Sequence, residues 1–311
     1  MSYRAERYLK FRESGLIPKE SFFDDKTGDE IRDLFLEILY GGVHGFCFSL
    51  YEDGQKPGDV IGEAQIRRRM KILQPYTKWI RSFSCIEGNE QIPRIAKEFG
   101  IKTLVGAWLG REEDKNRQEI ENLIQLAKDG FVDIAAVGNE VLYRHDLSEE
   151  ELLDYIRKVK KEIPDIPLGY VDAYYEFAQR PALVDACDVI LSNCYPFWEG
   201  TDFRYSLEHM RQMFHHVTLA AKGKKVIITE TGWPGKGESL GKAVPSQINA
   251  IKYFINTQLW AIDENIEVFY FSSFDESWKV GNEGEVGAYW GIWDRYEKLK
   301  YADESFSKIE N

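Results

Sequence analysis

One segment indicates the architecture more clearly than any other part of this chain: Lys225-Val226-Ile227-Ile228-Thr229-Glu230. It is a short β-branched run, typical of a buried strand, and it ends abruptly in a carboxylate before Thr231-Gly232-Trp233-Pro234. A second apolar run, Ile134-Ala135-Ala136-Val137-Gly138, stops in the same way at Asn139-Glu140. Because α/β barrels carry their active sites at the carboxyl ends of parallel strands, we expect both glutamates to project into one barrel mouth.

Short β-branched or aromatic segments alternate with amphipathic helical stretches along the rest of the chain. Eight strands are predicted, at Val43–Leu50, Trp79–Phe83, Lys102–Trp108, Val132–Val137, Pro167–Val171, Val189–Cys194, Lys225–Thr229 and Glu267–Phe274. Helices are predicted at Asp29–Leu39, Asn116–Lys128, Ser148–Ile163 and Ser246–Ile262. This alternation predicts an α/β fold, a single (β/α)8 TIM barrel with an N-terminal helical extension.

A doubly wound open sheet is the alternative architecture. It usually carries a G-x-G-x-x-G turn after its first strand, whereas residues 52–58 read Glu-Asp-Gly-Gln-Lys-Pro-Gly. The barrel reading gives one domain over residues 1–311, with an extension at 1–40 and the barrel core at 43–295. The helix Asp29–Leu39 is expected either to close the barrel floor or to pack beside the last helix.

Charge and composition exclude several classes of partner. The formal net charge is −12, which disfavours nucleic acid and anionic lipid because both require clustered Lys and Arg. No cysteine pair has C-x-x-C spacing and no histidines have metal-ligand spacing, so we expect no metal and no cofactor. Cys47, Cys187 and Cys194 lie in apolar segments and are expected to be reduced and buried.

The first residues of the chain contain no apolar run of the kind found in signal peptides or membrane anchors. If Met1 is the native start, we expect a soluble cytoplasmic protein; otherwise, we expect a periplasmic or secreted one. Oligomeric state is left open.

Two carboxylates at one barrel mouth suit the cleavage of glycosidic bonds. One carboxyl, kept protonated, delivers a proton to the leaving oxygen, and the other, ionised, attacks the sugar or activates water. A single glutamate at the end of a strand is more often part of a surface ion pair. The pair of Glu140 and Glu230, each with Asn or aromatic neighbours, favours the catalytic interpretation.

The segments around both glutamates, residues 137–141 and 228–234, resemble the signature segments of glycoside hydrolase family 17, the β-1,3-glucanases. Further segments resemble bacterial members in order and spacing: residues 81–85, 105–109, 193–199, 274–279 and 287–291. The resemblance covers about residues 43–295. It implies a retaining mechanism with Glu140 as general acid/base and Glu230 as nucleophile.

The resemblance also implies further roles in substrate binding. Asn139 matches an asparagine that binds the sugar 2-hydroxyl, and Tyr195 matches a tyrosine that contacts the nucleophile. Glu276 and Lys279 match a pair near the catalytic carboxylates; an exposed i,i+3 ion pair is the alternative reading.

Aromatic side chains near strand ends are candidates for sugar stacking. Trp108, Trp198 and Trp233 follow predicted strands and should face the mouth, where flat rings stack on the C–H faces of sugars. Phe274 is expected either beneath the sugar at the cleavage site or in the core. Tyr51 ends the segment Phe48-Ser49-Leu50-Tyr51, where bacterial relatives tend to have Tyr-Ser-Pro-Tyr, and it is also included in the substrate-binding set.

Together these expectations predict a retaining hydrolase that cleaves laminarin-type β-1,3-glucan. A β-1,3-glucan transglycosylase is the alternative, because it shares the glycosyl-enzyme intermediate and passes the sugar to another glucan. A non-catalytic glucan-binding barrel is a third hypothesis, which the presence of both carboxylates disfavours. The expected partner is a β-glucan oligo- or polysaccharide; endo or exo action and the preferred chain length and branching stay open.

Overall fold

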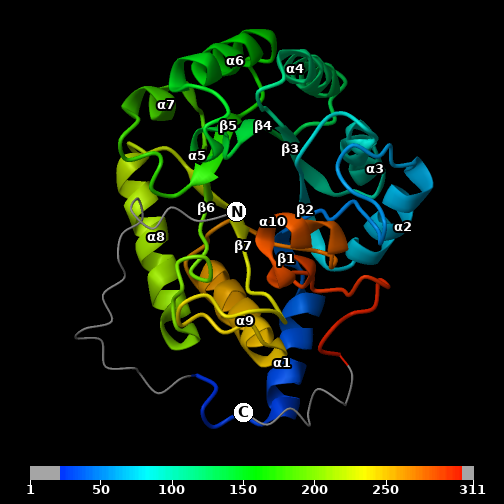
Figure 1. Ribbon diagram of the computed structural model, residues 1–311, viewed down its shortest axis with the longest axis vertical. Coiled ribbons are helices and arrows are strands. Elements are labelled where there is room, and N and C mark those ends of the chain that lie inside the picture. Colours follow the sequence, from blue (N-terminus) through cyan, green and yellow to red (C-terminus); the bar gives the residue numbers. More distant parts are fainter. Residues whose placement is uncertain (1–21, 303–311) are drawn as a thin grey trace.

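A closed barrel of parallel strands forms the centre of the molecule. The computed structural model describes residues 22–302, and within that range eight strands pair in chain order, with β8 returning to β1. The strands are β1 (Val43–Cys47), β2 (Thr77–Ser82), β3 (Lys102–Ala107), β4 (Ile134–Asn139), β5 (Leu168–Ala173), β6 (Ile190–Asn193), β7 (Val226–Thr231) and β8 (Val268–Tyr270). Figure 1 shows the strands ringed by helices. The predicted (β/α)8 barrel is confirmed.

Helices surround the barrel on its outside, apart from the short helix α10 (Val280–Glu283), which lies over the barrel centre (Figure 1). Among the described residues they are α1 (Gly28–Gly41), α2 (Glu63–Leu73), α3 (Ile92–Glu98), α4 (Glu113–Lys128), α5 (Val141–Arg144), α6 (Glu149–Glu162), α7 (Pro181–Ala186), α8 (Ser206–Ala220), α9 (Gln247–Asp263) and α10 (Val280–Glu283). The four predicted helices correspond to α1, α4, α6 and α9. Ser148 caps α6 through a capping box with Glu151, which explains why this boundary was readable from the sequence.

The helix α1 packs beside α9 (Figure 1). The ring of Phe35 on α1 meets the ring of Phe254 on α9 edge-on, with centroids 5.2 Å apart. Of the two positions expected for this helix, the structure therefore shows the one beside the last long helix. Residues 1–21 of the predicted extension lie outside the described part of the chain.

Two predicted strands are longer than the observed ones. β1 ends at Cys47 and β8 at Tyr270, although the apolar pattern continues to Leu50 and Phe274. Beyond these points the two segments are held to each other by side-chain bonds: the Ser49 hydroxyl donates to the carbonyl oxygen of Phe274 (2.9 Å) and accepts from its N–H (3.1 Å). These segments leave the barrel ladder and form part of the wall of its mouth.

The pairing register shifts at the mouth. It changes between Ala136 and Asn139 on β4, and between Ser192 and Asn193 on β6, where Asn193 comes to lie opposite Glu230. Such irregularities turn side chains away from the regular inward and outward alternation and are frequent beside active sites.

All four cysteines are buried and unpaired, as expected for Cys47, Cys187 and Cys194. Within residues 22–302 no helix combines the length and the apolar character that crossing a bilayer requires.

Candidate active site

Glu140 sits on a turn that the local sequence enforces. Gly138 has φ +88°, and a Cβ there would lie 2.9 Å from a methyl group of Val141, so only glycine fits without displacement. Glu140 itself adopts a left-handed conformation with φ 51°. Its N–H donates to the carbonyl of Val171 (2.8 Å), and its own carbonyl accepts from Arg144 (2.8 Å) to begin α5. The carboxylate is thereby fixed at the end of β4.

Glu230 lies near the end of β7 and is surrounded by donors. Its Oε1 accepts from the Arg81 guanidinium at 2.6 Å and from the Asn193 amide at 3.1 Å. Its Oε2 accepts from the Tyr195 hydroxyl at 2.9 Å. Charge-assisted bonds of this kind stabilise an ionised carboxylate in a buried site.

One amide nitrogen connects the two glutamates. Asn193 Nδ2 donates to Glu140 Oε1 at 2.9 Å and to Glu230 Oε1 at 3.1 Å, while its own oxygen accepts from the Thr229 hydroxyl. Since one atom reaches both, these oxygens lie within about 6 Å of each other. Retaining glycosidases have carboxyl groups about 5–5.5 Å apart, whereas inverting enzymes need about 6.5–9.5 Å to admit a water.

The two carboxyls have different electrostatic environments. Burial, together with the nearby charge of Glu230, raises the pKa of Glu140 to about 7; the Asn193 hydrogen bond opposes this rise. Glu140 therefore holds its proton near neutral pH, while the donors around Glu230 stabilise a negative charge.

Arg81 and Asn193 are the residues to which the sequence reading gave no role. Arg81 lies on β2 and is 1% exposed, and its second nitrogen donates to Asn139 Oδ1 at 2.6 Å. It therefore orients Asn139 and Glu230 together. An arginine near the end of a predicted barrel strand was the available signal, because a buried cation needs anionic partners.

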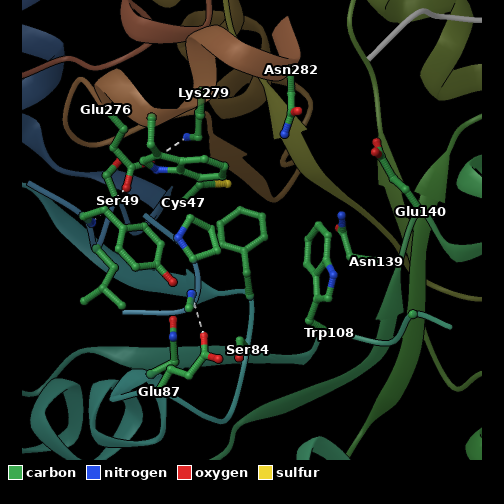
Figure 2. Close-up of a pocket in the computed structure, with 18 of the residues that line it drawn as sticks. Cys47, Ser49, Ser84, Glu87, Trp108, Asn139, Glu140, Glu276, Lys279 and Asn282 are labelled. Carbon is green, nitrogen blue, oxygen red and sulfur yellow. Dashed lines mark hydrogen bonds and ion pairs between the residues drawn. The ribbon is translucent and has the colours of Figure 1, made fainter. Parts of the chain in front are cut away.

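A cavity of about 900 Å³ opens above the carboxylates. Figure 2 shows Asn139, Glu140 and Trp108 along one side of it, with Ser49, Glu276 and Lys279 along the other. Within residues 22–302, no group of three His, Cys, Asp or Glu side chains is arranged to hold a metal ion.

Glu276 and Lys279 form a buried ion pair at 2.6 Å rather than an exposed one. Glu276 also accepts from the backbone N–H of Tyr51 at 3.0 Å, which joins the segments after β1 and β8. The Lys279 ammonium lies 4.3 Å from the ring centre of Phe271 and adds positive charge near Glu230.

Aromatic side chains form much of the wall of the cavity. Trp108 and Trp198 line it, as their positions at and after predicted strands suggested, and so do Tyr51 and Tyr195. Trp108 is 37% exposed, and one face of its indole is covered by the Arg144 guanidinium, 4.4 Å from the ring centre. Its other face is therefore the one available to a ligand.

Two expected substrate contacts are corrected by the structure. Trp233 is 1% exposed, donates its ring N–H to the Val244 carbonyl (3.0 Å), and packs among core aromatics such as Phe197. Phe274 is fully buried beneath the Arg69 guanidinium, with its centroid 4.6 Å away. Neither lines the cavity, because both rings are buried in the packing of the protein interior.

Comparison with known proteins places this geometry in a family. A family model described as the BtgE/BtgC glycoside hydrolase domain matches residues 45–291. A glucan 1,3-beta-glucosidase of Schizosaccharomyces pombe is 27% identical over 317 residues, covering 94% of this chain and 95% of the relative.

Solved structures agree with this match. A family 17 β-1,3-glucanosyltransferase from Rhizomucor miehei superposes with a TM-score of 0.75 at 27% identity, covering 84% of this chain and 96% of the other. An active-site mutant of that enzyme was solved with laminaritriose. An endo-laminarinase from Formosa, 17% identical, shares the fold with a TM-score of 0.71 and 88% coverage of each chain. The chain therefore belongs to the BtgE/BtgC glycoside hydrolase domain family, within glycoside hydrolase family 17.

Proposed function

We propose that this chain cleaves laminarin-type β-1,3-glucan by a retaining double displacement. The observation that carries the proposal is the Asn193 amide, which hydrogen-bonds both Glu140 and Glu230 and so holds them at the close spacing that this mechanism needs. The names of the relatives support the choice of substrate, since they act on 1,3-linked β-glucan.

In the first step, the Glu230 carboxylate attacks the anomeric carbon and forms an ester bond to the sugar. The bond to the leaving oxygen breaks as Glu140 transfers its proton to that oxygen. Arg81 and Tyr195 hold the attacking carboxylate in place. Asn139 accepts from Arg81 through its oxygen, which leaves its amide N–H groups for the sugar 2-hydroxyl.

In the second step, the ionised Glu140 accepts a proton from an incoming hydroxyl. That hydroxyl attacks the anomeric carbon, the ester bond breaks, and Glu230 leaves as a carboxylate. Two inversions at one carbon return the β configuration. If the hydroxyl belongs to water the result is hydrolysis, and if it belongs to a glucan the result is transfer.

Transglycosylation is the second candidate. The Rhizomucor miehei relative, similar over most of both chains, is named a glucanosyltransferase. The wall of Trp108 and Trp198 offers aromatic surface on which an acceptor sugar could stack in competition with water.

Product sizing separates the two activities. Laminari-oligosaccharides of one defined length would be incubated with the protein, and the products resolved by chromatography. Glucose alone indicates an exo-hydrolase, mixed shorter oligomers indicate an endo-hydrolase, and products longer than the substrate indicate a transferase. No change in the oligosaccharides would contradict the proposal.

Linkage specificity is tested with laminarin beside cellulose and alginate. We expect turnover of laminarin and little of the others, because the protein's negative charge disfavours an anionic polymer and the relatives act on 1,3 linkages. Comparable rates on a β-1,4 oligomer would exclude the proposed linkage.

A further inference from the structure

Trp198 and Glu199 occupy the centre of a tight turn after β6. The Gly200 N–H donates to the Phe197 carbonyl at 2.9 Å, and Gly200 has φ +69°, a conformation that glycine adopts without steric cost. The two central side chains have different environments. Trp198 lines the cavity, whereas the side chain of Glu199 is 1% exposed.

The Glu199 carboxyl is held by a buried histidine of α8. Its Oε2 lies 3.0 Å from Nε2 of His209, whose side chain is 3% exposed. The other ring nitrogen of His209, Nδ1, lies 2.6 Å from the Thr201 hydroxyl. The two contacts bring one histidine ring of α8 against two residues of the turn, Glu199 and Thr201.

A buried carboxylate here needs an explanation. Burial raises the pKa of Glu199, and the neighbouring His209 opposes that rise. Removing a charge from water is costly, and a buried ion pair is weak evidence for added stability. What the contact between Glu199 and His209 does supply is a defined orientation of the turn after β6.

We propose that Glu199 and His209 are a positioning pair that fixes Trp198 against the cavity and thereby sets the affinity for β-glucan. The inference rests on the proposed function, because it requires Trp198 to contact the glucan. Neither Glu199 nor His209 lines the cavity, so both act through the turn. The Trp198 indole also contacts the ring of Trp290, with ring centres 5.5 Å apart.

The test measures binding without turnover. Laminari-oligosaccharides are titrated into the Glu230→Gln variant by calorimetry, alone and with further substitutions. Trp198→Ala and Glu199→Ala should each raise Kd about 3- to 10-fold, the loss expected for one aromatic contact. Glu199→Gln should stay within about twofold of the parent, since glutamine has the same shape and keeps an oxygen where Glu199 Oε2 lies against His209 Nε2.

Combining the two substitutions in one protein distinguishes positioning of Trp198 from a general loss of structure. If Glu199 acts through Trp198, Glu199→Ala should add less than about twofold to the Kd of Trp198→Ala. Thr201→Val removes only the hydroxyl bonded to His209, and should raise Kd in the same direction by a smaller factor if Glu199→Ala fails to fold.

The matched control is Glu267→Ala. Glu267 pairs with Lys225 at 2.6 Å where β7 and β8 begin, at the opposite end of the barrel from the cavity. Its removal should leave Kd unchanged whatever it does to thermal unfolding, which is recorded for every variant. An unaltered Kd in Glu199→Ala beside a raised Kd in Trp198→Ala would overturn the inference, as would fully additive effects. Absence of any binding by the Glu230→Gln parent would instead overturn the proposed function.

Discussion

Replacing Glu230 with glutamine removes the negative charge next to Glu140. The resulting change in the acidity of Glu140 can be calculated from the distance between the two carboxyl groups. Both carboxyls bond one amide nitrogen, so they lie within about 6 Å of each other. Coulomb's law at an effective dielectric constant of about 20 gives about 3 kcal/mol for two unit charges at that separation. Glu230→Gln should therefore increase the acid dissociation constant of Glu140 about 100-fold.

The assay is a carbon-13 NMR titration of the side-chain carboxyls in glutamate-labelled protein, with Glu140→Gln identifying the resonance. In the unsubstituted protein, Glu140 should titrate with a pKa of about 7. Below that pH the Glu140 carboxyl keeps the proton that it donates to the leaving oxygen. The cleavage rate should therefore be retained at lower pH and should fall as the pH rises through the pKa of Glu140. If the acid dissociation constant of Glu140 differs by less than about threefold between Glu230→Gln and the unsubstituted protein, the electrostatic coupling of the two groups is refuted.

Three further substitutions test other parts of the site. Arg81→Met leaves Glu230 without the guanidinium at 2.6 Å. If the lost interaction of about 3 kcal/mol appears in the barrier, kcat should fall at least about 10²-fold in assays with laminari-oligosaccharides, and an unchanged kcat would exclude the role given to Arg81. Glu230→Ala should lose at least about 10³-fold in rate and regain part of it with azide as an α-glucosyl azide, whereas Glu140→Ala should give the β-azide from an activated substrate. Swapped azide products would reverse the two roles. Trp233→Ala should lower the free energy of unfolding by about 3–5 kcal/mol with KM unchanged, because the ring is buried; a raised KM in a stably folded variant would return Trp233 to the glucan-binding surface.

The order of elements was predictable because each element carries its own local signal. The short run 225–230 is rich in β-branched residues, which is typical of a buried strand, and Ser148 with Glu151 marks the start of α6 by a capping box. The ends of β1 and β8 were not predictable. Apolar residues continue past both ends, but there the ladder is replaced by bonds between the Ser49 hydroxyl and the Phe274 backbone on the neighbouring segment.

The candidate site was predictable where strand position alone decides which way a side chain points, as for Glu140 and Glu230 at the ends of β4 and β7. It was not predictable where the path of a loop decides. Trp198 and Trp233 each follow a strand closely, yet one lines the cavity and the other is buried with its ring N–H bonded to Val244. The link between Asn193 and both carboxylates depends on a register shift at β6, which no sequence pattern reveals.

The configuration of the first product tests the retaining mechanism most directly. Proton NMR of a fresh digest of laminari-oligosaccharides in deuterated buffer resolves the anomeric signals of the new reducing ends before mutarotation equilibrates them. The close spacing held by Asn193 predicts that the β-anomer accumulates first and the α-anomer appears only later. An α-anomer as the first product would contradict the double displacement and the roles proposed for Glu140 and Glu230.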